Sequence, residues 1–376
     1  MRIHKSSSKA RREEAIAIVI VMIAILVLAI LAGGFAYSMK VETTLALRAN
    51  NEAELEWLGR SGVEYARWIL AAQRACPAEQ FDALSQVWAG GTGNGPCSTN
   101  SALGEVIKEV HLGNGYFTWK ITDHESKYNI NVANEAILQQ ALLLMGVDAG
   151  EFPPLVGAIL DWVDPDDQQH VDGAENDYYH GLQPPYDAKN GPIDDISELL
   201  MVRGVTAEMY WGAGSTNHGG IGAVYQSPTA ASGRSSRLGM EGMPAYSVGL
   251  VDLFTPISSG KININTASEA VLQLIPGVDA QRAEAIVSAR SGEDDGSGIT
   301  GPFRSVDPGY LFNRVPGLGL EVARQVSRFG DVHSSSFDVE IEAHIGSSTR
   351  RFNAVLGRSP NPRDVQILTF CWKFDK

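Results

Sequence analysis

"KYNINVANEAILQ" (Lys127–Gln139) and "KININTASEAVLQ" (Lys261–Gln273) are two nearly identical stretches of one chain. Nine of the thirteen positions agree, with K, N, I, N, A, E, A, L and Q in register, which indicates a repeated structural unit. In the second copy, Thr266 and Glu269 have the spacing of a capping box and predict the start of a helix. The first copy lacks the threonine, so Asn131 is the expected cap there. The asparagines of both copies are expected to bond nearby backbone groups rather than to take part in chemistry.

Segments with the alternation of β-strands flank the repeated region on both sides. Before it, residues 106–123 predict a hairpin, because alternating residues surround the turn "GNG" (113–115), whose residues tolerate positive φ. After it, "FDVEIEAHI" (337–345), "RRFNAVLGR" (350–358) and "VQILTFCWKF" (365–374) predict three more strands. One antiparallel sheet, interrupted by a large helical insertion, accounts for both groups of strands.

The chain begins with a basic segment and an apolar run, "AIAIVIVMIAILVLAILAGGFAY" (residues 15–37). At about 1.5 Å per residue a helix of this length crosses the ~30 Å hydrocarbon core of a membrane. Basic residues before the run place the N-terminus in the cytoplasm by the positive-inside rule: Arg2, Lys5, Lys9, Arg11 and Arg12. The pattern continues to about residue 75 as an amphipathic helix that we expect to pack on the folded part of the chain.

Composition limits the function of that folded part. The 376 residues carry a net charge of −14, which argues against a surface that binds nucleic acid. Cys76 and Cys97 bracket a loop rich in Gly, Pro and Ser, and in an oxidising periplasm a disulfide between them would stabilise the fold by roughly 3 kcal/mol. The sequence leaves both the bonded and the free state open. Cys371 lies in a strand-like segment, where we expect a small core residue, and the polar segment 213–239 is expected to be a mobile surface loop.

An unusual density of carboxylates follows the first repeat: Asp161, Asp164, Asp166, Asp167, Asp172, Glu175 and Asp177. These charges repel one another unless water solvates them or a hard divalent cation such as calcium neutralises them. The spacing is not that of an EF-hand, because no Gly stands at the sixth place from Asp161 and no Glu at the twelfth. His170 is expected to be a surface residue. Composition alone therefore leaves a calcium site and a solvated acidic loop open.

One long segment carries a resemblance to a known family. "DWVDPDDQQHVDGAENDYYHGLQPPYDAKNGPIDDISELLMVRGV" (Asp161–Val205), together with the anchor and the repeats, resembles the K-type large minor pseudopilin of bacterial type II secretion. The resemblance implies a structural part, not an enzyme, which caps a short periplasmic fibre with two other minor pseudopilins. It also implies contact with the inner-membrane secretion platform, and bound calcium. We expect the calcium ligands to be Asp161, Asp164, Asp166, Glu175 and Asp177.

The resemblance also implies that prepilin peptidase removes the basic leader. Ala15 stands where the family carries Gly, so the mature chain is expected to begin at Ile16. Ile20 takes the place at which most pilins carry a glutamate that pairs with a neighbouring subunit. An unpaired carboxylate at membrane depth is costly, so Ile20 fits a subunit with no neighbour above it.

Three rival functions remain. "IPGVD" (275–279) and "VPGLG" (315–319) are typical of helix-hairpin-helix motifs, which bind DNA phosphates through backbone N–H groups and suggest a membrane-anchored DNA receptor of competence type. Asp279 and Glu321 place negative charges where phosphate would lie, so we expect these hairpins to serve in packing and the chain to bind no nucleic acid. A minor pilin of a related type IV pilus is the second rival. The third, a metal hydrolase, lacks a nucleophile elbow or a paired-histidine motif.

These observations predict an α+β protein in which a long N-terminal transmembrane and amphipathic helix packs on an antiparallel pilin-like sheet. A large, mostly α-helical insertion with helix-hairpin-helix-like repeats interrupts the sheet. The expected parts are a leader (1–15), a transmembrane segment (16–37), the periplasmic half of the helix (38–75), a loop with the first strands (76–126), the two halves of the insertion (127–258 and 259–333) and the last strands (334–376).

Overall fold

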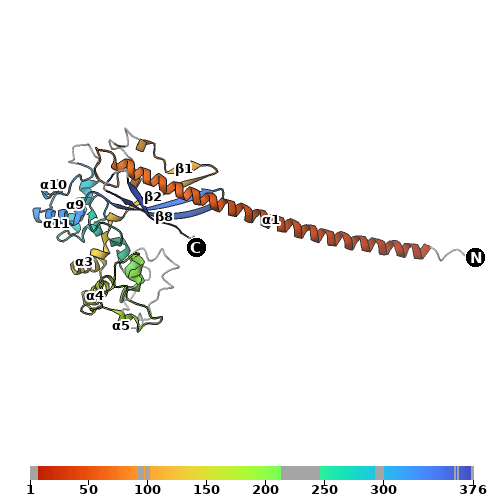
Figure 1. Cartoon of the computed structure of the whole chain (residues 1–376), viewed down its shortest axis with the longest axis horizontal. Coiled ribbons are helices and arrows are strands. Elements are labelled where there is room, and N and C mark those ends of the chain that lie inside the picture. Colours follow the sequence, from red (N-terminus) through yellow and green to blue (C-terminus); the bar gives the residue numbers. More distant parts are fainter. Residues whose placement is uncertain are drawn as a thin grey trace, which may run out of the picture.

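A single helix dominates the shape of the protein. The computed structural model describes residues 7–91, 97, 102–212, 246–292, 300–359, 361 and 364–373, so the predicted loop at 213–239 lies outside the described residues. Helix α1 (Ser7–Arg74) projects far beyond the folded part on its N-terminal side and enters it with its C-terminal side (Figure 1). Among the described helices, α1 alone is long and apolar enough to cross a membrane, and its apolar window from Ala17 onward is not buried by the protein.

A five-stranded antiparallel sheet has the strand order β1-β2-β7-β8-β9. Its strands are β1 (Glu109–Leu112), β2 (Gly115–Asp123), β7 (Ser336–Ile345), β8 (Ser348–Arg358) and β9 (Val365–Lys373). β2 pairs with β7, with Ile121 opposite Val339, so the first hairpin joins strands that follow it by more than 200 residues. The predicted interrupted sheet is confirmed, and β1 and β9 form its edges. Cys371 is exposed on β9, so the prediction of a core position for it is wrong. Its cross-strand partner is Asn353, so it lies on the face of the sheet away from α1.

The C-terminal half of α1 packs on one face of this sheet (Figure 1). Gly59 and Gly62 permit the close approach, because a Cβ atom at either position would overlap the side chains of Phe352 and Ile341. The shared core consists of apolar residues from α1 and from alternate positions of the strands: Leu55, Leu58, Val63, Ala66, Ile69, Leu70, Phe117, Ile121, Phe337, Val339, Ile341, Ala343, Phe352, Ala354 and Leu356. The amphipathic stripe predicted for this half of the helix faces the core from Leu55 onward, whereas Leu45, which the pattern also predicts to belong to the stripe, is exposed.

The chain between β2 and β7 is mostly helical and has its own apolar core. Its α-helices are α3 (Glu135–Met145), α4 (Phe152–Val163), α5 (Asn176–Tyr179), α6 (Ala207–Trp211), α7 (Leu250–Leu253), α8 (Glu269–Leu272), α9 (Ala280–Arg290), α10 (Pro308–Arg314) and α11 (Leu320–Phe329). Two short parallel pairs complete it: β3 (Tyr128–Asn129) with β4 (Phe254–Thr255), and β5 (Ile262–Asn263) with β6 (Gly330–Asp331). Each repeat thus opens on a strand of one such pair.

The asparagines make the repeat visible in three dimensions. The side chain of Asn131 donates to the carbonyl of Ile193 at 3.0 Å and accepts from its N–H at 2.7 Å. Asn265 exchanges the same two bonds with Phe303, at 2.9 and 2.8 Å. The prediction of nearby backbone partners is confirmed for Asn129 and Asn263, each of which accepts from the N–H two residues later at 2.9 Å. The partners of Asn131 and Asn265 instead lie 62 and 38 residues away. Each of these last two asparagines therefore fastens a distant loop to its repeat.

The helix caps differ from those predicted. Asn134 caps α3 by accepting from Ile137 N–H at 3.1 Å, and Ser268, at the equivalent position of the second repeat, caps α8 by accepting from Val271 N–H at 3.3 Å. Neither Asn131 nor Thr266 caps a helix, because both helices begin later than expected. The Thr266 hydroxyl instead donates to Asp123 Oδ2 at 2.5 Å.

A buried polar junction joins the sheet to the helical insertion. Asp123, at the end of β2, is almost wholly buried and accepts hydrogen bonds through Oδ2 from Asn263, Thr266 and Ser334. Burial first, and then the nearby charge of Glu125, raises the pKa of Asp123 to about 8. Polar side chains rather than apolar ones therefore make up part of the contact between the two cores.

Candidate metal centre

The end of α4 and the loop after it bring the carboxylates together. Asp161 lies in the last turn of α4 and is fully buried, and Asp164 is the C-cap, with extended backbone. The loop then returns across the helix at Gly173, which comes so close that a Cβ there would collide with the carboxylate of Asp161. Gly157 on α4 is close to the same loop, since its Cβ would lie 2.8 Å from the carbonyl oxygen of Val171. Two glycines therefore permit the loop to lie directly on the helix.

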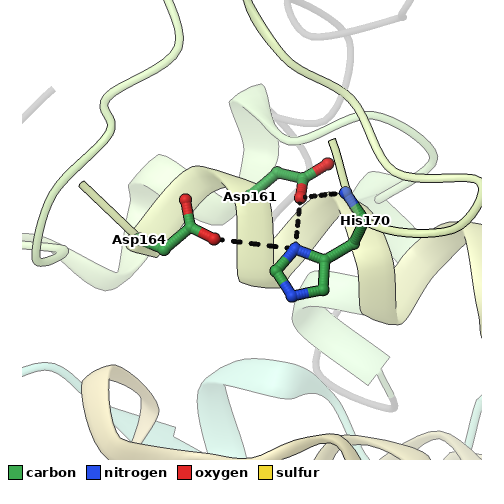
Figure 2. A group of neighbouring side chains, drawn as sticks. All are labelled: Asp161, Asp164 and His170. Carbon is green, nitrogen blue, oxygen red and sulfur yellow. Dashed lines mark hydrogen bonds and ion pairs between the residues drawn. The ribbon is translucent and has the colours of Figure 1, made fainter. Parts of the chain in front are cut away.

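His170 is the residue that connects the two aspartates (Figure 2). Its Nδ1 lies 2.6 Å from Asp161 Oδ1 and 3.6 Å from Asp164 Oδ2, and its backbone N–H donates to Asp161 Oδ1 at 2.8 Å. One ligand atom from each of the three residues lies within 4.8 Å of the other two. His170 is exposed, as expected, with 46% of its side chain accessible. The sequence did not predict its contacts with the aspartates, and its place inside the acidic segment was the signal that could have shown them.

Several oxygens of the cluster have no hydrogen-bond partner among the described residues. They are buried, and they comprise Asp161 Oδ2, Asp164 Oδ1 and both carboxylate oxygens of Glu175. Burial, followed by the charges of Asp161 and Asp164, raises the pKa of Glu175 to about 7. Burial and the charge of Asp166 likewise raise the pKa of Asp164. Among the described residues, His170 is the ionisable nitrogen group that contacts these carboxylates, and a divalent ion would supply further positive charge.

The other predicted ligands divide into two groups. The negative charge of Asp166 raises the pKa of both Asp164 and Glu175. Its Oδ1 also accepts a hydrogen bond from Gln168 N–H at 2.8 Å. Asp177 lies exposed in the first turn of α5, and in the described part of the chain no hydrogen bond or ion pair joins it to the cluster. Of the five predicted ligands, the structure places Asp161 and Asp164 in one group of possible ligand atoms, together with His170. The charges of these two aspartates and of Asp166 act on the pKa of Glu175.

Neighbouring residues hold the acidic loop in place. Asp167 Oδ1 accepts from the side chains of Asn176 at 3.0 Å and Asn190 at 2.8 Å. Arg203 donates to the carbonyl oxygen of Gly173 at 2.9 Å, and its guanidinium stacks 4.9 Å from the ring centre of Tyr178. These contacts come from outside the loop, so the positions of its carboxylates do not depend on the loop alone.

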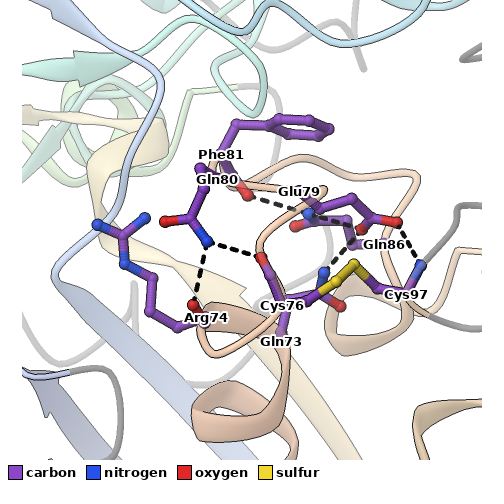
Figure 3. Close-up of a disulfide and its surroundings, with 8 residues drawn as sticks. All are labelled: Gln73, Arg74, Cys76, Glu79, Gln80, Phe81, Gln86 and Cys97. Atoms are coloured by element: carbon purple, nitrogen blue, oxygen red, sulfur yellow. Dashed lines mark hydrogen bonds between the residues drawn. A yellow bond between two sulfur atoms is a disulfide. The ribbon is translucent and has the colours of Figure 1, made fainter. Parts of the chain in front are cut away.

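A disulfide joins Cys76 to Cys97, with the two Cα atoms 6.0 Å apart (Figure 3). Glu79 accepts from Cys97 N–H at 3.1 Å and from the side chain of Gln73 at 2.7 Å. The segment that follows α1 is thereby fastened to the end of that helix.

The two hairpins differ at the start of their second helices. Asp279 caps α9 by accepting from Arg282 N–H at 2.9 Å, and it also pairs with the Arg282 guanidinium at 2.8 Å. Gly319 precedes α11 without a side-chain cap, and Glu321 pairs with Arg324 at 3.0 Å. Carboxylates thus occupy the helix starts at which phosphate would bind in a DNA-binding hairpin.

Comparison with known proteins agrees with this architecture. The family model "Type II secretion system (T2SS), protein K" matches residues 120–212, and the model "Helix-hairpin-helix motif" matches residues 258–308. The type II secretion system protein K of Pectobacterium carotovorum subsp. carotovorum is 27% identical over 111 residues, which cover 26% of this chain and 34% of the relative. The protein of the same name from Klebsiella pneumoniae is 32% identical over 114 residues, covering 27% and 34%. The matched region thus spans about a third of the length of these relatives.

A solved structure has the same fold over most of the chain. A chain in the crystal structure of the GspK-GspI-GspJ complex from the type 2 secretion system of enterotoxigenic Escherichia coli aligns with a TM-score of 0.59. The alignment covers 87% of this chain and 99% of that one, at 18% identity.

A single apolar N-terminal helix, an antiparallel sheet and an inserted helical region with an acidic loop define an architecture like that of the solved secretion-complex chain. The middle of the chain, residues 120–212, matches the protein K family, and the curated relatives match over about a quarter of the chain. The resemblance found in the sequence is therefore confirmed.

Proposed function

We propose that the chain is a minor pseudopilin at the tip of the type II secretion pseudopilus. The observation that carries this proposal is the fold match to a chain of the GspK-GspI-GspJ complex, over nearly the whole length of both. By that likeness, two other minor pseudopilins are the expected partners. The helix on its antiparallel sheet then corresponds to a pilin-like core, and the protein acts as a structural component for export of folded proteins rather than as an enzyme.

The anchor supports the same role. The folded part does not cover the apolar part of α1. Such an exposed apolar helix suits a position in lipid or against helices of other subunits. Basic residues at the start of the chain favour a cytoplasmic N-terminus and a periplasmic body. We propose cleavage by prepilin peptidase between Ala15 and Ile16, and assembly on the inner-membrane platform. Ile20 stands where most pilins carry a glutamate, so this chain has no carboxylate at that depth in the membrane. This supports a position at the tip.

Calcium at the acidic loop is part of this proposal. Among the described residues, Asp161, Asp164 and Glu175 offer buried carboxylate oxygens without hydrogen-bond partners, and the charge of Asp166 raises the pKa of Asp164 and of Glu175. Calcium takes six to eight oxygen ligands in flexible geometry, which suits carboxylates from a helix end and a loop. Asp177 is left out of the proposed set because it lies exposed on α5. The ion would supply positive charge that holds the loop closed.

Secretion in a deletion strain tests the main proposal. Loss of the gene should leave folded exoproteins in the periplasm, and the full chain should restore their release. Affinity purification of the chain from cross-linked membranes should recover two other minor pseudopilins. Normal secretion in the deletion strain would contradict the proposal, and accompanying loss of a surface pilus would instead support a minor pilin of a related type IV system.

A DNA receptor remains the second candidate, because the helix-hairpin-helix model matches residues 258–308. Its weakness is electrostatic: Asp279 and Glu321 sit at the helix starts and are paired with arginines of their own helices. Loss of DNA uptake with intact secretion in the deletion strain would favour this candidate.

A further inference from the structure

The acidic loop holds a nitrogen atom that a calcium site does not require. His170 Nδ1 lies 2.6 Å from Asp161 Oδ1 and 3.6 Å from Asp164 Oδ2. Two ligands that share one tetrahedral zinc ion at about 2.0–2.2 Å lie about 3.3–3.6 Å apart. The separation from Asp164 has this length, and the hydrogen bond to Asp161 would have to lengthen by less than about 1 Å. Imidazole with carboxylates is a ligand set typical of zinc and its neighbours, whereas calcium prefers oxygen alone.

A second observation points to an ion at the same place. Asp161 is 0% exposed and Glu175 is 7% exposed, yet Asp161 Oδ2 and both oxygens of Glu175 have no hydrogen-bond partner among the described residues. Buried carboxylate oxygens are costly unless a hydrogen bond or a cation compensates them. Asp161 links the unpartnered oxygens to His170, because its Oδ2 has no hydrogen-bond partner among the described residues while its Oδ1 contacts the imidazole.

Hydrogen bonds within the protein orient the imidazole of His170 toward the carboxylates. The His170 backbone N–H donates to Asp161 Oδ1, which fixes the start of the side chain over α4. On one side of it, Gln169 donates to the carbonyl oxygen of Gly173 at 2.6 Å, and Arg203 donates to the same oxygen. A ligand positioned in this way loses little conformational freedom when it binds a metal.

We propose that this pocket also accepts a first-row transition-metal ion of the zinc type, with His170 Nδ1 as a ligand beside Asp161, Asp164 and Glu175. The inference rests on the proposed metal role of the acidic loop and extends it. Calcium would use the oxygens alone, whereas zinc would use the oxygens and the imidazole. Replacing His170 should therefore separate the two ions.

Metal titration of the full chain in detergent, after removal of metal with a chelator, tests the inference. Zinc chloride and calcium chloride are titrated separately into the wild type, His170→Ala and His180→Ala. His180 is the matched control because its Nε2 lies 2.6 Å from Asp187 Oδ1 at an exposed site outside the cluster. His170→Ala should weaken the zinc site at least about tenfold and change calcium affinity less than about threefold, while His180→Ala leaves both within about threefold.

Each outcome separates the two proposals. Unchanged zinc affinity in His170→Ala, with calcium bound normally, would overturn the imidazole ligand and leave the calcium site standing. A wild-type chain that binds neither ion would overturn both. Should His170→Ala fold poorly, His170→Asn keeps a polar side chain with an oxygen ligand, and it should retain calcium while losing zinc affinity. The secretion assay tests the pseudopilin role independently of these titrations.

Discussion

Arg358 Nη1 lies 2.7 Å from Asp82 Oδ1 and 2.8 Å from Asp82 Oδ2, which joins two almost fully buried side chains that are 276 residues apart. Asp82 follows α1, and Arg358 ends β8. Arg358 also donates to the carbonyl oxygen of Leu70 on α1, and Asp82 accepts from Ser334 N–H, so the ion pair lies where α1, the sheet and the end of the insertion meet.

Breaking this pair should destabilise the fold strongly. Arg358→Met leaves Asp82 buried without its cation, and the free energy of unfolding should fall by about 3–5 kcal/mol. Arg324→Met is the control, because Arg324 pairs with Glu321 on the exposed surface of α11 and its loss should cost less than about 1 kcal/mol. Urea unfolding of the soluble part measures both, and equal effects would contradict the assignment.

Asp123 should make stability depend on pH. Its pKa in the folded state is raised to about 8 from an ordinary value of 3.8, so the folded chain keeps a proton that the unfolded chain loses. The contribution of Asp123 is thus fully present below pH 3.8, declines as pH rises, and is lost above pH 8. The urea midpoint of Asp123→Asn should fall less than that of the wild type between pH 5 and pH 9. Asp187→Asn, at an exposed position, should follow the wild type.

Chelation should loosen the acidic loop. At ~5 Å and an effective dielectric of ~20, each uncompensated pair of carboxylates costs about 3 kcal/mol before relaxation. A chelator should therefore lower the melting temperature, calcium should restore it, and magnesium should do so poorly. Asp164→Ala should remove most of the calcium response, while Asp187→Ala should keep it. An unchanged melting curve would indicate a solvated acidic loop.

Processing should remove the basic leader. The mature protein from a strain with active prepilin peptidase should begin at Ile16, as N-terminal sequencing will show. Ala15→Leu should block cleavage because of its bulk, whereas Ala15→Gly should allow it. Recovery of Met1 from the wild type would refute this site.

DNA binding should be absent at physiological salt. The carboxylates of Asp279 and Glu321 should keep the dissociation constant for duplex DNA no tighter than the non-specific range of ~10⁻⁴ to 10⁻⁶ M. Tighter binding by the wild type, measured by fluorescence anisotropy, would support the function of a DNA receptor. Asp279→Gly combined with Glu321→Lys should bind more tightly than the wild type, because it restores uncharged donors and a positive charge.

The sequence predicted the sheet, the anchor and the repeat because each has a local pattern. Alternation shows in residues 337–345, apolar length in residues 15–37, and identical spacing in the two "NIN" stretches. The helix caps were wrong because Asn134 and Ser268 are also good caps, and the long-range bond from Thr266 to Asp123 has no local signature.

The sequence predicted the carboxylates of the candidate site but not the part played by its histidine. The high density of carboxylates around Asp161 and Glu175 indicated a cation site, since so many anions close together need a neutralising partner. The contact of His170 with Asp161 depends on how the loop returns over α4, and the exposure of Asp177 depends on the direction of α5. The junction of Asp82 with Arg358 joins distant segments and could not be read from either one.

The insertion leaves the sheet after Asp123 and returns at Phe337, and these two residues are cross-strand partners. Closing a flexible loop of more than 200 residues would cost about 5 kcal/mol in chain entropy before β2 and β7 gain any contact. An insertion that has already folded brings its own two ends together and removes most of that cost. We therefore expect the helical insertion to acquire its structure before the two halves of the sheet pair, and strands protected from amide exchange before the insertion would contradict this order.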